Sequence, residues 1–360
     1  MSGDGRPGST RGDVRAATDG DSYVHGASPG EGPHTAQETR TGVGRDRGAK
    51  EIPMVPKDRP RTYYDRPLVK PPVWKPEIPW YLFTGGLGGA SSVLAYAATL
   101  SGNRRLAKRA WLMAFAGITV SPVLLTSDLG RPERFFNMLR VFKITSPMSV
   151  GSWLLVANGA AVAPVAAAQV LGFPKRLGRR AEPLAALLGP PLATYTGVLL
   201  ANTSIPAWSE ARMELPLLFA SGGAASAGAA AAIATPTRYA GPARRLALAG
   251  AAGEVINSEL MKRRLGTLAS VYEGGEVGRY EQIARACTVA GAALIAGAGK
   301  RRVGAIAGGA LLLAGALAKR WAVFKAGIAS AEDPHQTVGP QRERVEQRKR
   351  EAAVEGAVTG

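Results

Sequence analysis

The feature that most constrains this chain is a series of long stretches without a charged residue. Five of them contain no Asp, Glu, Lys, Arg or His: Trp80–Leu100, Ala110–Ser127, Ile144–Pro174, Pro183–Ser209 and Leu215–Thr237. Each has at least the ~18 residues that an apolar helix needs to cross a bilayer. A spanning segment must satisfy its own backbone hydrogen bonds, so the pattern predicts an all-α integral membrane protein, multi-pass in the cell membrane.

Further apolar segments bring the expected number of transmembrane helices to about eight. We place them near residues 80–100, 110–127, 147–171, 184–202, 214–235, 243–260, 282–299 and 303–324. The last two have short uncharged cores, which favours a hairpin of tilted or short helices. Gly and Ala dominate throughout. The glycine-rich run 85–89 therefore predicts close helix–helix approach.

Polar segments flank the predicted transmembrane domain, which we assign to residues 80–326. Residues 1–60 are rich in Gly, Pro, Arg, Asp and Thr, and we expect a disordered polar tail. Residues 61–79 form a Pro-rich extended arm that could lie on a partner surface. Residues 327–360 form a polar C-terminal tail.

The formal net charge is +18, and most of the excess lies in the loops of the membrane domain. Between residues 80 and 330 there are 27 Lys and Arg against 10 Asp and Glu. Basic residues in short loops set topology and contact lipid headgroups. The chain does not show the basic, aromatic-rich face of a nucleic-acid-binding protein. The odd-numbered loops are the more basic, which favours placing them in the cytoplasm.

Cysteine and histidine usage argues against a redox cofactor bound by this chain alone. Cys287 is the only cysteine, whereas an iron–sulfur cluster takes about four thiolates. The three histidines, His25, His34 and His335, all lie in polar tails. We therefore expect neither haem nor an iron–sulfur cluster in this chain, and no metal site within its membrane part.

The most informative loop follows the second predicted helix. It reads DLGRPERFFNML (128–139) and leads into SPMSVGSW (146–153). Here Arg131, Arg134 and Arg140 stand beside aromatic and amide side chains, a surface suited to docking a protein partner. The Ser-Pro pair that opens the second motif predicts a helix start, because Pro is favoured at the first helical position.

These motifs resemble the NrfD/PsrC family, the quinol-interacting membrane subunits of polysulfide reductase and related molybdoenzyme complexes. Further similar stretches are PWYLFTGGLGGASS, YTGVLL, PAW and WAVFKAGIASAEDP, so the resemblance spans about residues 78–335. It implies two four-helix bundles, with a quinone site in the first. It also implies docking to a ferredoxin-like four-cluster iron–sulfur subunit joined to a molybdenum or tungsten catalytic subunit. A formate dehydrogenase-like enzyme is one candidate for that catalytic subunit.

The resemblance also implies a function and a set of quinone-binding residues. The chain would anchor the complex and bind quinone, menaquinone included, as a substrate that exchanges electrons with the iron–sulfur partner. Tyr195 matches the tyrosine of the family's YTG-like motif, and Tyr81 and Thr84 open the first helix near the same face. For Tyr81 the alternative is an aromatic side chain of the membrane-interface belt. The Asn and His that the first helix of better-described members supplies are missing from Trp80–Leu100.

Four ionisable residues are candidates for proton transfer: Asp128, Arg131, Glu254 and Glu259. Ionisable groups within a bilayer are costly and usually functional or paired. Glu254 lies inside the sixth predicted helix and is the stronger candidate. A structural role, with Glu254 hydrogen-bonded to Asn257 or Ser258, is an equal alternative.

Two other functions fit the same sequence. Breaks at Gly189-Pro190-Pro191 could build the midplane site of a secondary transporter. A non-redox membrane anchor for a soluble enzyme is the second. As an electron-transfer subunit, the chain would have no catalytic centre beyond its reaction with quinone.

Overall fold

The computed structural model describes residues 69–129, 131, 133–172, 175–336, 338, 345–346 and 348–350. The predicted tail 1–60 and the first part of the predicted arm lie outside these residues. What is described belongs to one compact unit, residues 61–360.

Eight long helices contain most of the described residues, in the order that the apolar stretches predict. They are α1 (Glu77–Leu100), α2 (Arg104–Asp128), α4 (Pro147–Val170), α5 (Lys175–Ala201), α7 (Glu214–Ala234), α8 (Gly241–Leu265), α9 (Gly275–Ala298) and α10 (Arg302–Glu332). Three short elements join them: α3 (Arg134–Arg140), α6 (Pro206–Ser209) and the 3-10 helix η2 (Gly266–Tyr272). The described residues contain no β-strand, so the all-α fold class is confirmed.

Several helices extend beyond their predicted ends because charged residues continue the helix past the apolar core. α2 begins six residues before its predicted start, where the Asn103 side chain accepts a hydrogen bond from the Leu106 amide. α10 runs to Glu332, eight residues beyond its predicted end. The start of α4 was predicted correctly, with Ser146 as the cap and Pro147 at the first position.

Five of the long helices are long and apolar enough to cross a membrane: α2, α4, α5, α7 and α10. The other three do not reach the same apolar content over a membrane-spanning length. α1 carries many Gly and Ser residues, and α8 and α9 carry several charged side chains. The eight long helices are therefore observed, and eight membrane crossings stay a prediction.

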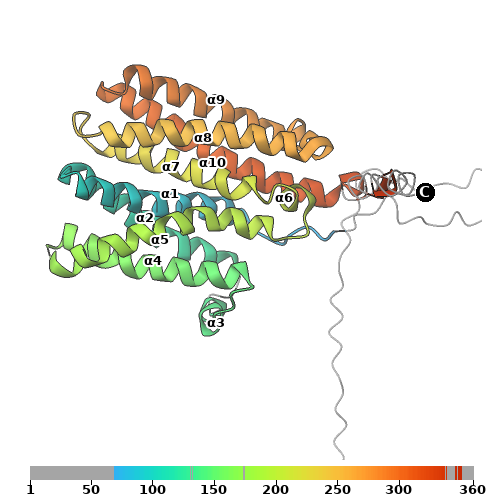
Figure 1. The fold of residues 1–360 in the computed structure, drawn as a ribbon, viewed down its shortest axis with the longest axis horizontal. Helices are drawn as coiled ribbons and strands as arrows, with labels where there is room; N and C mark the ends of the chain where they lie inside the picture. The colour runs from blue at the N-terminus through green and yellow to red at the C-terminus, as the bar shows by residue number, and fades with distance from the viewer. Residues whose placement is uncertain are drawn as a thin grey trace, which may run out of the picture. The chain divides into compact units, whose positions relative to one another are not determined.

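The helices pack as two groups of four (Figure 1). In the first bundle α1 packs against α2 and α5, and α4 packs against α5 and α2. In the second bundle α7 pairs with α8, α9 pairs with α10, and α10 also contacts α7. The bundles meet where α1 and α5 pack against α7. This arrangement agrees with the two four-helix bundles implied by the resemblance.

Glycines allow the closest of these helix contacts. A Cβ atom added at Gly223 of α7 would lie 2.9 Å from the Gly86 carbonyl oxygen of α1. One added at Gly117 of α2 would lie 2.8 Å from the Gly88 Cα atom. The predicted role of the glycine run in α1, close helix packing, is confirmed at these positions.

The two ends of the helical unit differ. The loops after α1, α4, α7 and α9 are short, and 14 Lys and Arg residues lie in or beside them with one acid, Glu182. We call this the basic end. The opposite end, the arm end, carries α3, α6, η2 and the described part of the arm, residues 69–76 (Figure 1).

The described part of the arm packs on its own chain. Trp74 stacks on Trp208 of α6, with ring centroids 5.5 Å apart and planes inclined by 17°. The Trp208 indole nitrogen donates a 2.8 Å hydrogen bond to the Val323 carbonyl oxygen of α10. The Lys75 amide donates a 2.8 Å hydrogen bond to the Asp128 carboxylate at the end of α2. The arm therefore connects elements of both bundles.

Candidate functional site

The first bundle buries the two tyrosines that the sequence singled out, and it brings them together. Tyr81 in the first turns of α1 is 1% exposed, and Tyr195 of α5 is 7% exposed. Their side chains are close enough to interact with each other, both electrostatically and as hydrogen-bonding groups. No well-formed hydrogen bond engages the Tyr81 hydroxyl within the described part of the chain. A buried hydroxyl whose hydrogen bond is not well formed is uncommon in folded proteins, and it can turn its hydrogen toward a ligand.

The surroundings of this tyrosine pair are apolar and tightly packed. Leu82, Leu155 and Leu192 belong to the same buried cluster as the two rings. The Tyr195 ring lies directly against Gly151 of α4, where an added Cβ atom would overlap the ring. Gly151 therefore makes the space that the Tyr195 side chain occupies.

Thr84 lies one turn beyond Tyr81, and its hydroxyl faces α2. It lies 2.9 Å from the Ser121 hydroxyl and 3.3 Å from the Tyr81 carbonyl oxygen. Because Ser121 donates to the Gly117 carbonyl oxygen, the Thr84 hydroxyl is available as the donor toward Ser121. The third predicted quinone ligand is thus part of an internal hydrogen-bond chain.

The predicted docking arginines lie at the arm end. Arg131, Arg134 and Arg140 are all exposed. Large apolar side chains beside them are exposed too, among them Phe136 (71%) and Ile144 (79%). The segment offers cations and apolar groups together, as a docking surface requires. Asp128, a candidate for proton transfer, lies close by and holds the arm through the Lys75 amide.

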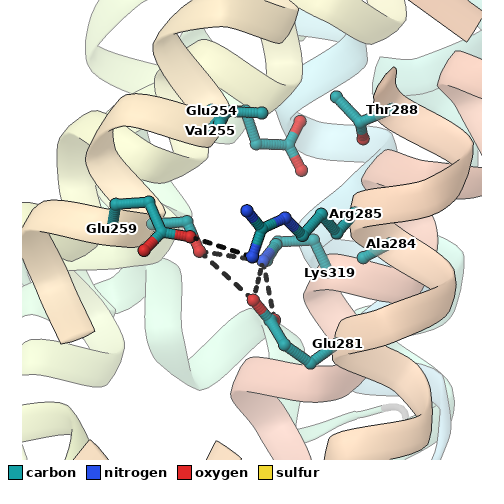
Figure 2. A pocket seen from close by; sticks show the side chains of 9 residues that line it. Glu254, Val255, Glu259, Glu281, Ala284, Arg285, Thr288 and Lys319 are labelled. Carbon is teal, nitrogen blue, oxygen red and sulfur yellow. Dashed lines mark hydrogen bonds and ion pairs between the residues drawn. The ribbon is translucent and has the colours of Figure 1, made fainter. Parts of the chain in front are cut away.

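The second bundle contains a buried ionic cluster (Figure 2). The Lys319 ammonium of α10 lies 2.7 and 2.6 Å from the two oxygens of the Glu281 carboxylate of α9. Lys262 of α8 lies 2.7 Å from the same carboxylate. The Ser258 hydroxyl accepts a 3.0 Å hydrogen bond from Lys319. Glu281 and Lys319 are 5% and 4% exposed, so this is a paired charge cluster inside the protein.

Glu254 and Arg320 form a second charged group beside this cluster. Each is 1% exposed. Arg320 donates a 2.8 Å hydrogen bond to the Phe219 carbonyl oxygen, and its guanidinium lies 4.0 Å from the centre of the Phe219 ring. Both oxygens of Glu254, and Nε and Nη1 of Arg320, have no hydrogen-bond partner among the described residues. The two side chains converge on Gly222, where an added Cβ would lie 3.0 Å from Glu254 and 2.9 Å from Arg320.

The residues named as structural partners of Glu254 are engaged elsewhere. Asn257 donates to the Gly253 carbonyl oxygen and to the Ser221 hydroxyl. Ser258 contacts Lys319 and Glu281. Neither residue therefore hydrogen-bonds to Glu254, and a structural role through the electrostatic attraction of Glu254 to Arg320 and Lys319 stays an open alternative.

Glu259 and Tyr272 lie at the margin of the ionic cluster. Glu259 pairs with Arg285 at 3.5 Å; the Arg285 side chain is largely exposed and the Glu259 side chain is partly exposed. At the arm end, burial raises the pKa of the Tyr272 phenol well above its ordinary value, and the nearby Glu281 carboxylate adds to the rise. Tyr272 therefore stays a neutral hydroxyl at physiological pH.

Sequence reasoning missed four charged members of this region: Lys262, Glu281, Lys319 and Arg320. The usable signal was present in α10, where two adjacent cations follow an apolar run. The uncharged core of this helix ends at residue 318, just before them, and an apolar pattern alone does not single out the two cations that follow. Among the described residues, no group of three or more His, Cys, Asp or Glu side chains could hold a metal ion.

A comparison of the sequence with models of known protein families identifies the family of this chain. The family model described as polysulphide reductase, NrfD, matches residues 67–247. The chain belongs to the NrfD family. The matched region holds the first bundle, α7 and the start of α8, so it contains the tyrosine pair and the loop arginines. No curated protein matches the chain.

Family and fold together make this NrfD-family chain an integral membrane protein. The match covers just over half of the chain. Most of the buried ionic cluster lies beyond it, on the later part of α8 and on α9 and α10.

Proposed function

We propose that this NrfD-family chain is the membrane anchor and quinone- or quinol-binding subunit of a molybdopterin-type oxidoreductase. It would exchange electrons between the membrane quinone pool, menaquinone included, and a ferredoxin-like four-cluster iron–sulfur subunit. A molybdenum or tungsten subunit, with a formate dehydrogenase-like enzyme as one candidate, would carry the catalytic chemistry. The chain would thus serve respiratory electron transport.

The observation that carries this proposal is the pair of buried hydroxyls of Tyr81 and Tyr195, of which the Tyr81 hydroxyl has no well-formed hydrogen bond within the described chain. A quinone presents carbonyl oxygens that accept hydrogen bonds and a flat apolar ring. The donor set fits this chemistry, because two phenol groups lie among leucine side chains of the first bundle. The Tyr195 and Tyr81 hydroxyls would donate to a carbonyl oxygen, with Thr84 holding the first turns of α1 against α2.

Electron transfer between a partner's cluster and the quinone requires a short distance between them, and a partner docked at the arm end would meet this requirement. Tyr81 lies in the first turns of α1 and Tyr195 in the last turns of α5, so the tyrosine pair is on the same side of the bundle as Arg131, Arg134 and Arg140. An iron–sulfur subunit docked on these arginines would bring a cluster close to the quinone site.

Proton exchange accompanies quinone chemistry, and Glu254 is the best supported of the proposed groups. Its carboxylate is buried and has neither oxygen partnered within the described chain. A water between Glu254 and Arg320 would satisfy both groups, since charged atoms of each approach Gly222. Asp128, Arg131 and Glu259 complete the proposed set, and these lie nearer to solvent.

The test is Tyr195→Phe in membranes that contain the whole complex. Losing one hydrogen bond to the quinone should cost about 0.5–1.5 kcal/mol, while the ring keeps its packing. The apparent Michaelis constant for quinone should rise, and the activity with an artificial dye should stay unchanged. Tyr96→Phe in α1 is the matched control, because Tyr96 packs in a different cluster.

Equal quinone-linked and dye-linked rates in Tyr195→Phe and wild type, at all quinone concentrations, would remove Tyr195 from the site. A chain without bound quinone after purification would favour the non-redox anchor. The transporter alternative lacks its broken helix here, because α5 runs through Pro190 and Pro191 without interruption.

A further inference from the structure

A second pocket opens at the basic end of the first bundle, away from the tyrosine pair. Its volume is about 420 Å³, within the range of ~300–1,000 Å³ that ligand pockets usually have. All four helices of the bundle line it, through the ends of α1 and α4 and the starts of α2 and α5. Its polar side chains are Thr99, Arg104, Gln169, Lys175, Arg179 and Glu182.

Three of these side chains are cations without a close ionic partner among the described residues. Arg104, Lys175 and Arg179 are exposed, and no side-chain hydrogen bond or ion pair within 4.0 Å engages any of them among the described residues. Only Arg179 interacts with Glu182, electrostatically and at longer range. Three unpaired cations around one pocket form a site for a phosphate group.

Other basic residues of the same end are already in use. Arg105 and Arg238 both lie over the Tyr239 ring, 4.7 and 4.6 Å from its centre. Arg244 donates to the Thr237 carbonyl oxygen at 2.8 Å, and Arg302 donates to the Thr235 carbonyl oxygen at 3.3 Å. The unengaged cations at the pocket are therefore distinct from the part of the basic end that supports the fold.

Glu182 restricts which phosphate compound would fit. It is 6% exposed and lies in the pocket wall beside Thr99 and Arg179. An ionised carboxylate would repel a bare phosphate dianion. A phosphate diester with a hydroxyl-bearing headgroup avoids this conflict, because the hydroxyl can donate a hydrogen bond to the carboxylate.

The surroundings of the pocket suit a lipid. Val170 and Leu171 at the end of α4 and Leu177 in the first turn of α5 are 62%, 77% and 53% exposed. These apolar side chains lie next to the pocket residues in the chain and would contact acyl chains. Basic pockets between membrane helices are known to bind anionic headgroups.

We propose that this pocket binds an anionic phospholipid with a hydroxyl-bearing headgroup, of which phosphatidylglycerol is the simplest. Arg104, Lys175 and Arg179 hold the phosphate diester, and Glu182 accepts a hydrogen bond from the headgroup hydroxyl. The acyl chains lie along the outer faces of α4 and α5. This lipid site is separate from the proposed quinone site and does not depend on it.

Native mass spectrometry of the full-length chain, released from nanodiscs of phosphatidylglycerol and phosphatidylcholine, tests the proposal. Wild type should retain one tightly held phosphatidylglycerol. The triple variant Arg104→Gln, Lys175→Gln, Arg179→Gln should retain it at least about tenfold less. The control Arg109→Gln, Arg176→Gln, Arg180→Gln removes the same charge from exposed residues outside the pocket, and it should behave as wild type.

Equal loss in the two triple variants, or equal retention of phosphatidylcholine by wild type, would overturn the proposal in favour of diffuse lipid attraction. Displacement of the lipid by millimolar inorganic phosphate would instead make free phosphate the ligand. A fourth variant, Glu182→Gln, should reduce the preference for phosphatidylglycerol over phosphatidic acid, which lacks the hydroxyls.

A measurement on wild type alone covers the case in which the triple variant does not fold. Phosphatidylglycerol with a photoreactive headgroup should crosslink to peptides within residues 99–107 and 165–182. Crosslinks spread evenly over all the loops of the basic end would contradict a defined site.

Discussion

The two bundles bury different kinds of polar group. Apart from Glu182 at the basic end, the buried polar side chains described in the first bundle are neutral. They are Tyr81, Ser91, Ser92, Trp111, Ser121, Ser152, Asn158, Tyr195 and Thr196. The second bundle buries two carboxylates and two cations, Glu254, Glu281, Lys319 and Arg320.

This difference separates two tasks. Neutral hydroxyls can bind and release an uncharged ligand with a modest desolvation penalty. Buried charges are far more costly to separate, and each must keep a partner of opposite sign. The first bundle is therefore suited to exchanging a quinone, and the second to holding charge in a fixed arrangement.

The largest expected effect is that of Lys319→Met, which removes the charge closest to Glu281. The carboxylate would keep Lys262 as its cation and the Ser258 hydroxyl as a hydrogen-bond donor. Breaking a buried pair costs about 3–5 kcal/mol. The free energy of unfolding in mixed micelles measures this loss.

Lys325→Met is the matched control on the same helix. Lys325 pairs with Glu276 at 3.2 Å, and both side chains are partly exposed. Such a pair contributes roughly 0–1 kcal/mol. Equal losses in the two variants would mean that the second bundle does not depend on its buried charges.

A middle-sized effect is expected from Gly151→Ala in the first bundle. The added methyl group would overlap the Tyr195 ring, and overpacking of this kind costs about 1–3 kcal/mol. Quinone-linked turnover should fall more than dye-linked turnover.

Gly159→Ala on the same helix is its control. The added Cβ atom there meets only the Cγ2 atom of Ile118, at 3.2 Å. If both variants lowered the two activities in parallel, the Tyr195 position would have no special bearing on quinone.

Reversal of the charge at Arg131 and Arg134 to Glu should weaken docking of the proposed iron–sulfur subunit by roughly tenfold, with the membrane chain still inserted. The amount of partner that co-purifies with the chain measures it. Arg212→Glu with Arg263→Glu, two exposed arginines at the same end, should retain the partner. A complex that survives the first pair unchanged would make these arginines ordinary solvated charges.

The smallest effect should come from Glu259→Gln. Its ion pair with Arg285 is open to solvent on the Arg285 side and partly exposed at Glu259, and exposed pairs contribute about 0.2–1 kcal/mol. The same unfolding experiment applies. A loss of unfolding free energy as large as that of Lys319→Met would mean that Glu259 contributes as much as the buried cluster does. Exposed and buried charges would then not differ in their effect on stability.

The helices were predictable because an uncharged stretch long enough to cross a bilayer has few other ways to fold. The exact ends of the helices were harder to predict. The first turns of α2 and α5 consist largely of charged residues, and a search for apolar stretches does not include them in the helix. The same cause hid Lys319 and Arg320, which lie in a helix that continues past its apolar core.

The candidate site residues also fall into those that the sequence predicted and those that only the structure shows. Motif resemblance pointed to Tyr81 and Tyr195, and the fold brings the two together. The pairing of Glu281 with Lys319 joins residues 38 positions apart, and only the packing of α9 on α10 brings them into contact. Gly151 could not be recognised in advance, because a glycine in a membrane helix does not indicate which side chain will occupy the space beside it.

The stack of Trp74 on Trp208 has a consequence for biogenesis. Residue 74 leaves the ribosome early, whereas Trp208 is held in place by Val323 near the end of α10. We therefore expect the arm to pack in its final position only after the last helix has been translated and inserted. In a chain truncated before Val323, Trp208 would lose this hydrogen bond and the arm would lose its fixed packing partner.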